Sequence, residues 1–146
     1  MALLAGGAPA LAWRSCGASL CRWQHGGSVY DKMVQVTIVG LDGRRHLVRG
    51  LEGQPLVNVL HVNEDAFGED VVGLSPEGRG ALEAHVLVPN EALASIPPLN
   101  ADDTRVLEQL SPDLQPNSRL ASRIKLSKTL NQMVIALGAI RPWKSL

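Results

Sequence analysis

The folded part of the chain opens on an alternation of apolar and polar positions that holds from Val34 to Ile38. Over residues 34–39 every second residue is a β-branched apolar one, which predicts a strand with one buried face made of Val34, Val36 and Ile38. Asp42 and Gly43 follow, and this pair favours a tight turn because both residues tolerate a positive φ. We therefore predict an amino-terminal β-hairpin whose second strand covers residues 45–48.

The pattern beyond the hairpin predicts short elements around one long loop. The expected elements are a helix over 56–63 that starts just after Pro55, a loop over 65–79, a strand over 84–88, a helix over 100–110, and strands over 123–126 and 133–137. Asn100 is a typical N-cap residue. This order of elements predicts an α+β fold of the β-grasp type, in which a mixed sheet wraps one helix, although ubiquitin-like domains share the order.

Composition limits the classes of function. A chain of 146 residues with 45% apolar and 19% charged residues has room for one globular domain with tails. Its 14 basic and 14 acidic residues balance, so no basic stripe indicates nucleic-acid binding. No apolar run reaches the length of about 18 residues that a membrane span requires. We expect contact with a membrane only through a larger complex.

The first 28 residues have the composition of a mitochondrial transit peptide. They contain Arg14 and Arg22, and the first acidic residue of the chain is Asp31. This predicts import, the matrix side of the inner membrane as the location, and a mature domain over 34–137 with a tail over 138–146. A secretory signal is the competing interpretation because residues 1–12 are apolar, but these residues include no basic one.

Both cysteines of the chain, Cys16 and Cys21, lie inside this predicted presequence. Cleavage would therefore leave a mature protein without a thiol, a disulfide or a thiolate metal ligand. The remaining sequence shows no Gly-x-Ser-x-Gly elbow, phosphate loop or dinucleotide fingerprint. We expect that the protein is not an enzyme, except as a non-catalytic subunit of an oxidoreductase complex.

Residues 34–137 resemble the adrenodoxin-type mitochondrial ferredoxins, which belong to the 2Fe–2S ferredoxin superfamily. Three segments carry the resemblance: GALEAHVLVP at 80–89, PNSRLAS at 116–122 and LSKTLNQMVI at 126–135. In that family the first segment bears the second and third cluster cysteines and the second bears the fourth. The resemblance implies the same β-grasp fold and places the loop over 65–79 next to a former cluster site.

The family's cysteine spacing falls on residues that cannot replace thiolates. Carried onto this sequence, the four ligand positions are Ser75, Ala81, Ala84 and Ser122. Clusters of this type are held by cysteine thiolates, whereas alanine offers no donor and a neutral hydroxyl is a poor ligand for iron. We therefore predict a degenerate iron–sulfur site without a cofactor.

Two histidines and a group of carboxylates have alternative interpretations. His85 lies beside a former ligand position and could bind a lone metal ion with His61 or Glu83, or it could form hydrogen bonds within the old cluster loop. Family members dock basic redox partners through carboxylates on the helix before the fourth cysteine. The corresponding residues here are interrupted by Arg105 and are better explained as helix-turn charges and a solvated face: Asp102, Asp103 and Glu108.

Within the family, the chain resembles the ferredoxin-like accessory subunit of plant and algal respiratory complex I. That resemblance implies a structural bridge between the matrix and membrane arms, in contact with an acyl carrier protein and an LYR-motif subunit. The alternatives are a ferredoxin-type electron carrier or single-metal-ion binder with unconventional ligands, and a free-standing binding module. Trp143 in the tail could anchor a partner or fold back onto its own domain.

Overall fold

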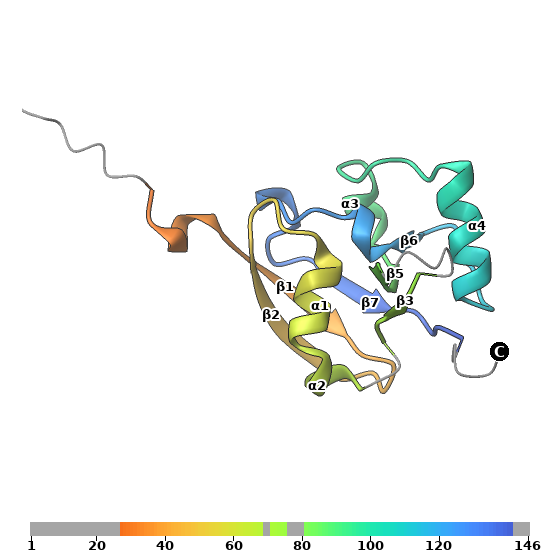
Figure 1. Ribbon diagram of the computed structural model, residues 1–146. Helices are drawn as coiled ribbons and strands as arrows, with labels where there is room; N and C mark the ends of the chain where they lie inside the picture. Colours follow the sequence, from red (N-terminus) through yellow and green to blue (C-terminus); the bar gives the residue numbers. More distant parts are fainter. Residues whose placement is uncertain (1–26, 69–70, 76–80, 142–146) are drawn as a thin grey trace, which may run out of the picture.

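The computed structural model describes residues 27–68, 71–75 and 81–141 of the chain. Within these residues, five strands form a mixed sheet in the order β2-β1-β7-β5-β6 (Figure 1). The strands are β1 (Met33–Val39), β2 (Arg45–Leu51), β5 (His85–Leu87), β6 (Ser118–Leu120) and β7 (Val134–Leu137). Strand β1 pairs antiparallel with β2 and parallel with β7, and β5 pairs antiparallel with both β6 and β7.

The amino-terminal hairpin forms as the sequence predicts. Val34, Val36 and Ile38 are buried, and Gly43 in the turn has a φ of 79°. Strand β2 continues to Leu51, three residues beyond the predicted end. This extension passes close to the core at Gly50, where any Cβ would overlap the Leu126 side chain, so only glycine fits without a shift of its neighbours.

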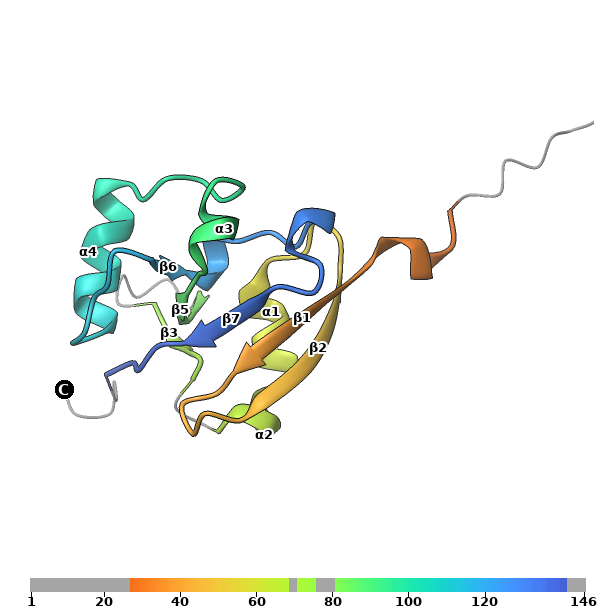
Figure 2. The same cartoon turned by 180° about the vertical axis from the view of Figure 1, so that it is seen from behind.

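Helix α1 (Leu56–Val62) lies against one face of the sheet, whereas the opposite face of β1, β2 and β7 carries no helix in the described part of the chain (Figures 1 and 2). Its buried side chains join those of β1, β5 and β7 in the main core: Leu56, Val57, Val59 and Leu60. The helix is also joined to the segment near residue 125, because the Leu56 N–H donates to the Ile124 carbonyl at 2.8 Å. The predicted β-grasp arrangement is thus present.

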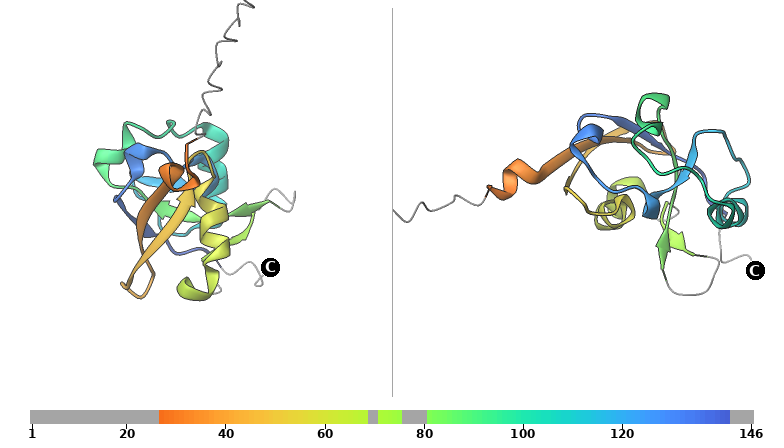
Figure 3. Two further views of the ribbon diagram at one scale, coloured as in Figure 1. Left: turned by 90° about the vertical axis from the view of Figure 1, so that its left-hand side faces the viewer. Right: turned by 90° about the horizontal axis from the view of Figure 1, so that it is seen from above.

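Helix α4 (Ala101–Leu110) packs at the far end of the sheet beside β6, as Figure 3 shows from above. A second, smaller core joins them and contains Val106, Leu107, Leu110 and Leu120. Asn100 occupies the N-cap position, but its side chain makes no capping hydrogen bond. Its carbonyl instead accepts a hydrogen bond from the Thr104 hydroxyl at 2.9 Å.

Several short elements differ from the prediction. The predicted loop over 65–79 includes the end of helix α2 (Glu64–Phe67) and strand β3 (Gly73–Leu74), and the predicted strand over 84–88 is preceded by strand β4 (Leu82–Glu83), which pairs with β3. The predicted strand over 123–126 is absent from this described segment, which forms only an isolated bridge between Pro55 and Lys125. Further short elements are η1 (Val29–Lys32), α3 (Asn90–Leu93), η2 (Ala121–Arg123) and η3 (Lys128–Leu130).

These differences arise because tertiary contacts, not local patterns, decide the short segments. The Ala84 carbonyl accepts the Ala121 N–H at 2.9 Å, which draws the chain out of the strand between β4 and β5.

No helix among the described residues is long and apolar enough to cross a membrane. The predicted presequence lies outside the described residues except for its last two, as do Pro142 and Trp143.

Candidate functional site

The four positions matched to cluster ligands lie around the β3–β4 hairpin and the short helix η2. Ser75 directly follows β3, Ala81 directly precedes β4, and the Ser75 N–H donates to the Ala81 carbonyl at 2.7 Å. Ala84 is fully buried at the β4–β5 junction. Ser122 lies in η2, and the N–H of the preceding residue, Ala121, donates a hydrogen bond to the Ala84 carbonyl. The hairpin that joins the first two positions is therefore closed by backbone pairing.

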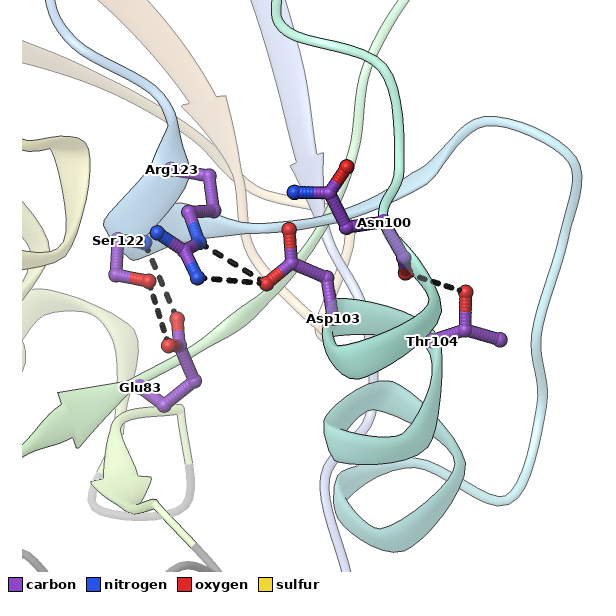
Figure 4. A network of polar contacts seen from close by, with 6 residues as sticks. All are labelled: Glu83, Asn100, Asp103, Thr104, Ser122 and Arg123. Carbon is purple, nitrogen blue, oxygen red and sulfur yellow. Dashed lines mark hydrogen bonds and ion pairs between the residues drawn. The ribbon is translucent and has the colours of Figure 1, made fainter.

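Glu83 brings the third and fourth ligand positions together. Its side chain is buried, and its Oε2 accepts a hydrogen bond from the Ser122 hydroxyl at 2.6 Å (Figure 4). Its Oε1 accepts the backbone N–H groups of Ser122 at 3.1 Å and of Ala84 at 3.2 Å. One carboxylate thus takes three donors from two segments that are 39 residues apart in sequence.

These residues do not fit a 2Fe–2S cluster. Such clusters need soft anionic sulfur ligands, and the matched positions offer two hydroxyl groups and two methyl groups. One of the two hydroxyls, on Ser122, is already engaged with the Glu83 carboxylate. That carboxylate is a hard oxygen donor whose hydrogen-bonding capacity is directed at protein donors.

An ion pair connects the site to helix α4. The Arg123 guanidinium donates from Nε at 3.0 Å and from Nη2 at 2.9 Å to Oδ1 of Asp103. Asp103 is only 5% exposed. The interpretation of Asp103 as part of a solvated helix face is therefore wrong, whereas Asp102 and Glu108 are exposed as that interpretation expects. Because Arg123 follows Ser122, the first turn of α4 is linked to the Glu83 network.

The two histidines have separate partners. His85 is buried, its Nε2 lies 2.8 Å from the Ser118 hydroxyl, and its Nδ1 lies 3.4 Å from the Ala139 carbonyl. The expected hydrogen bonding of His85 is present, but its partners are on β6 and after β7, not in the loop that resembles the cluster loop. His61 is exposed and pairs with Glu64 at 3.0 Å. Among the described residues no group of three or more His, Cys, Asp or Glu could hold a metal ion.

The environment of His85 predicts a pH dependence of stability. Burial lowers the pKa of His85 below its ordinary value of 6.5, against the opposing effects of the Ala139 carbonyl and the Asp113 charge. The unfolded chain then binds the proton more readily than the folded chain. The contribution of His85 to the free energy of unfolding should be fully present above pH 6.5 and should be lost as the pH falls.

Urea denaturation between about pH 7.5 and pH 5.5 measures this effect. The His85→Asn variant is the matched control, since it removes only this imidazole. The native chain should lose stability with falling pH more steeply than this variant. Equal slopes would contradict the assignment.

The comparisons with known proteins agree with the fold. No protein-family model matches the chain. Adrenodoxin-like protein 1, mitochondrial, from Drosophila melanogaster is 28% identical over 115 residues, which cover 79% of this chain. The match spans 63% of the length of that curated relative, so this chain corresponds to less than two thirds of it.

Two solved structures are similar over about 70% of this chain. A reduced putidaredoxin variant from Pseudomonas putida has a TM-score of 0.58 and 26% identity, over 71% of this chain and 95% of the other. A ferredoxin from Rhodopseudomonas palustris HaA2 has a TM-score of 0.53 and 25% identity, over 70% and 94% of the two chains. These similarities confirm the predicted ferredoxin-like β-grasp fold.

Proposed function

We propose that this chain, a relative of the adrenodoxin-like and putidaredoxin-type 2Fe–2S ferredoxins, keeps the ferredoxin fold without the cluster and acts by binding other proteins. The observation that carries this proposal is the 2.6 Å hydrogen bond from the Ser122 hydroxyl to the Glu83 carboxylate. It places an oxygen–oxygen contact at the fourth ligand position, where an iron-bound thiolate would be needed.

The residue chemistry gives further support to a role without electron transfer. The only two cysteines of the chain precede residue 22, and no matched ligand position carries sulfur. A domain that keeps its fold while losing its cluster ligands retains its surface as the part available for function. We therefore place the function in recognition of partner proteins.

A ferredoxin-type electron carrier with unconventional ligands is the second candidate. The relatives reported above are ferredoxins by name, which favours this alternative over a role as a subunit of respiratory complex I. Against it stand the two serines and two alanines at the matched positions. Metal analysis distinguishes the two candidates, because the electron carrier would bind iron and the cluster-free binding module would not.

The proposed location and partners rest on the amino-terminal sequence, one mitochondrial relative and the family resemblance. The acid-free segment before Asp31 and the mitochondrial relative support a mitochondrial location, and we propose the matrix side of the inner membrane. The sequence resemblance alone supports the finer proposal of an accessory role in complex I, next to an acyl carrier protein and an LYR-motif subunit.

Iron analysis and visible absorption of the chain freed of residues 1–28, and therefore of Cys16 and Cys21, test the absence of the cluster. After anaerobic incubation with iron and sulfide, we expect a colourless protein without stoichiometric iron, because the site offers no thiolate. A putidaredoxin, named as an Fe2S2 ferredoxin, serves as the parallel control and should become coloured. A reddish two-iron centre in the chain freed of residues 1–28 would overturn the proposal in favour of the electron carrier.

The complex I assignment needs its own experiment. Blue-native electrophoresis of mitochondria from the source organism, followed by detection of this chain, should show co-migration with complex I. Migration away from complex I would reject the bridge role while leaving the cluster-free binding module in place.

A further inference from the structure

We propose that Glu83 replaces the cluster as the fixed anion that holds the two halves of the site together. This inference rests on the proposed absence of the cluster and goes beyond it, because it assigns a positioning role to one side chain. Glu83 joins the β4–β5 junction, which carries the third ligand position, to helix η2, which carries the fourth. Its role is to order these two segments and, through them, the first turn of α4.

The geometry around Glu83 is that of an anion held by converging donors. The Ser122 O–H donates to one carboxylate oxygen, and the backbone N–H groups of Ser122 and Ala84 donate to the other. Backbone N–H groups that converge in this way form anion sites in many phosphate and iron–sulfur proteins. In this chain a side chain supplies the negative charge from within the protein.

Burial makes these bonds consequential. Glu83 is 6% exposed and Ala84 is 0% exposed, so donors at this position have little access to water. A buried donor that loses its acceptor costs the full desolvation of that group, and bonds to a charged acceptor are about twice as strong as neutral ones. Removal of the carboxylate should therefore loosen this site before the rest of the fold.

The ordering extends beyond the two segments in contact with Glu83. Ser122 is followed directly by Arg123, whose guanidinium makes two contacts to the buried Asp103 in α4 (Figure 4). The position of Arg123 thus depends on the position of η2. Glu83 thereby influences the placement of α4 without touching it.

Amide hydrogen exchange of the full 146-residue chain tests this role. The variants are Glu83→Ala, which removes the carboxylate, and Glu83→Gln, which keeps the size and one acceptor oxygen but removes the charge. Exposed Glu108 provides the matched control as Glu108→Gln. Protection of the Ala84 and Ser122 amides should fall about tenfold or more in Glu83→Ala and by a smaller factor in Glu83→Gln.

Strand β1 supplies the internal reference, because general destabilisation would reduce the protection of its amides as well. Faster exchange at Ala84 and Ser122 that extends to the Thr104 amide in the first turn of α4, with β1 unchanged, supports the positioning role. Unchanged exchange at Ala84 and Ser122 in Glu83→Gln, or an equal rise in β1, overturns it. Iron analysis of the same samples keeps this result separate from the proposed function, since a bound two-iron centre would reject the latter directly.

Discussion

Replacement of Gly138 by alanine is expected to lower the free energy of unfolding by at least about 2 kcal/mol. A Cβ at this position would overlap Nδ1 and Cε1 of the His85 imidazole and lie 2.6 Å from its Cγ. The ring cannot move aside freely, because it is buried and its Nε2 contacts the Ser118 hydroxyl. The backbone cannot withdraw without cost either, since the Gly138 N–H donates to the His85 carbonyl at 2.8 Å.

Urea denaturation measures this loss, and two further variants isolate its cause. Gly27→Ala is the control, because its Cβ would make only an ordinary contact at 3.7 Å from Asp31. In a His85→Ala background the ring is gone, so the added methyl group should cost much less than in the native chain. An equal cost in both backgrounds would show that steric overlap with His85 is not the cause.

A chain with cysteine at all four matched positions is expected to bind iron in stoichiometric amounts only when Glu83 is also replaced by a small neutral residue. The four changes are Ser75→Cys, Ala81→Cys, Ala84→Cys and Ser122→Cys. With Glu83 in place, its buried carboxylate remains beside the third and fourth positions, and it repels the additional negative charge of the thiolates. The further change Glu83→Ser replaces the carboxylate by a smaller, neutral side chain.

Iron and sulfide analysis together with visible absorption compares the two four-cysteine chains after anaerobic reconstitution. Cys16 and Cys21 should be absent from both, so that only the engineered thiols are tested. Equal iron uptake in the two chains would show that Glu83 does not oppose the cluster. A failure of both chains would show that the backbone at these positions, and not only the side chains, has departed from a cluster-binding geometry.

Local patterns in the sequence are sufficient to predict the longer elements. The alternation over 34–39 and the Asp-Gly turn give the β1–β2 hairpin, and the helices after Pro55 and Asn100 form at the expected places. The strand over 123–126 fails because its backbone groups bond to the start of helix α1 and the residues just before it: the Ile124 carbonyl accepts the Leu56 N–H, and the Leu126 N–H donates to the Gln54 carbonyl. Periodicity contains no information about such distant partners.

The site shows the same division between local and distant information. The four matched positions can be placed from the family resemblance, but the Glu83–Ser122 and Arg123–Asp103 contacts join residues far apart in sequence. The sequence contains one signal for Glu83: it is an acidic residue in a strand pattern from Leu82 to Val88 whose other members, except for His85, are apolar. A charge in such a run requires a partner when it is buried. The hypothesis of a metal site assigns Glu83 only the role of a ligand beside His85.

The position of β7 has a consequence for the order of folding. This strand lies between β1 and β5, so the β1–β2 pair and the β5–β6 pair belong to one sheet only through residues 134–137. On the ribosome these residues are synthesised after all the other strands that the structure describes. Their parallel pairing with β1 brings together two segments that are separated by almost the whole domain in sequence. Such distant pairing is slow to form. The sheet therefore becomes continuous only after its last strand has been synthesised. Until then the apolar face of the β1–β2 hairpin is incompletely covered.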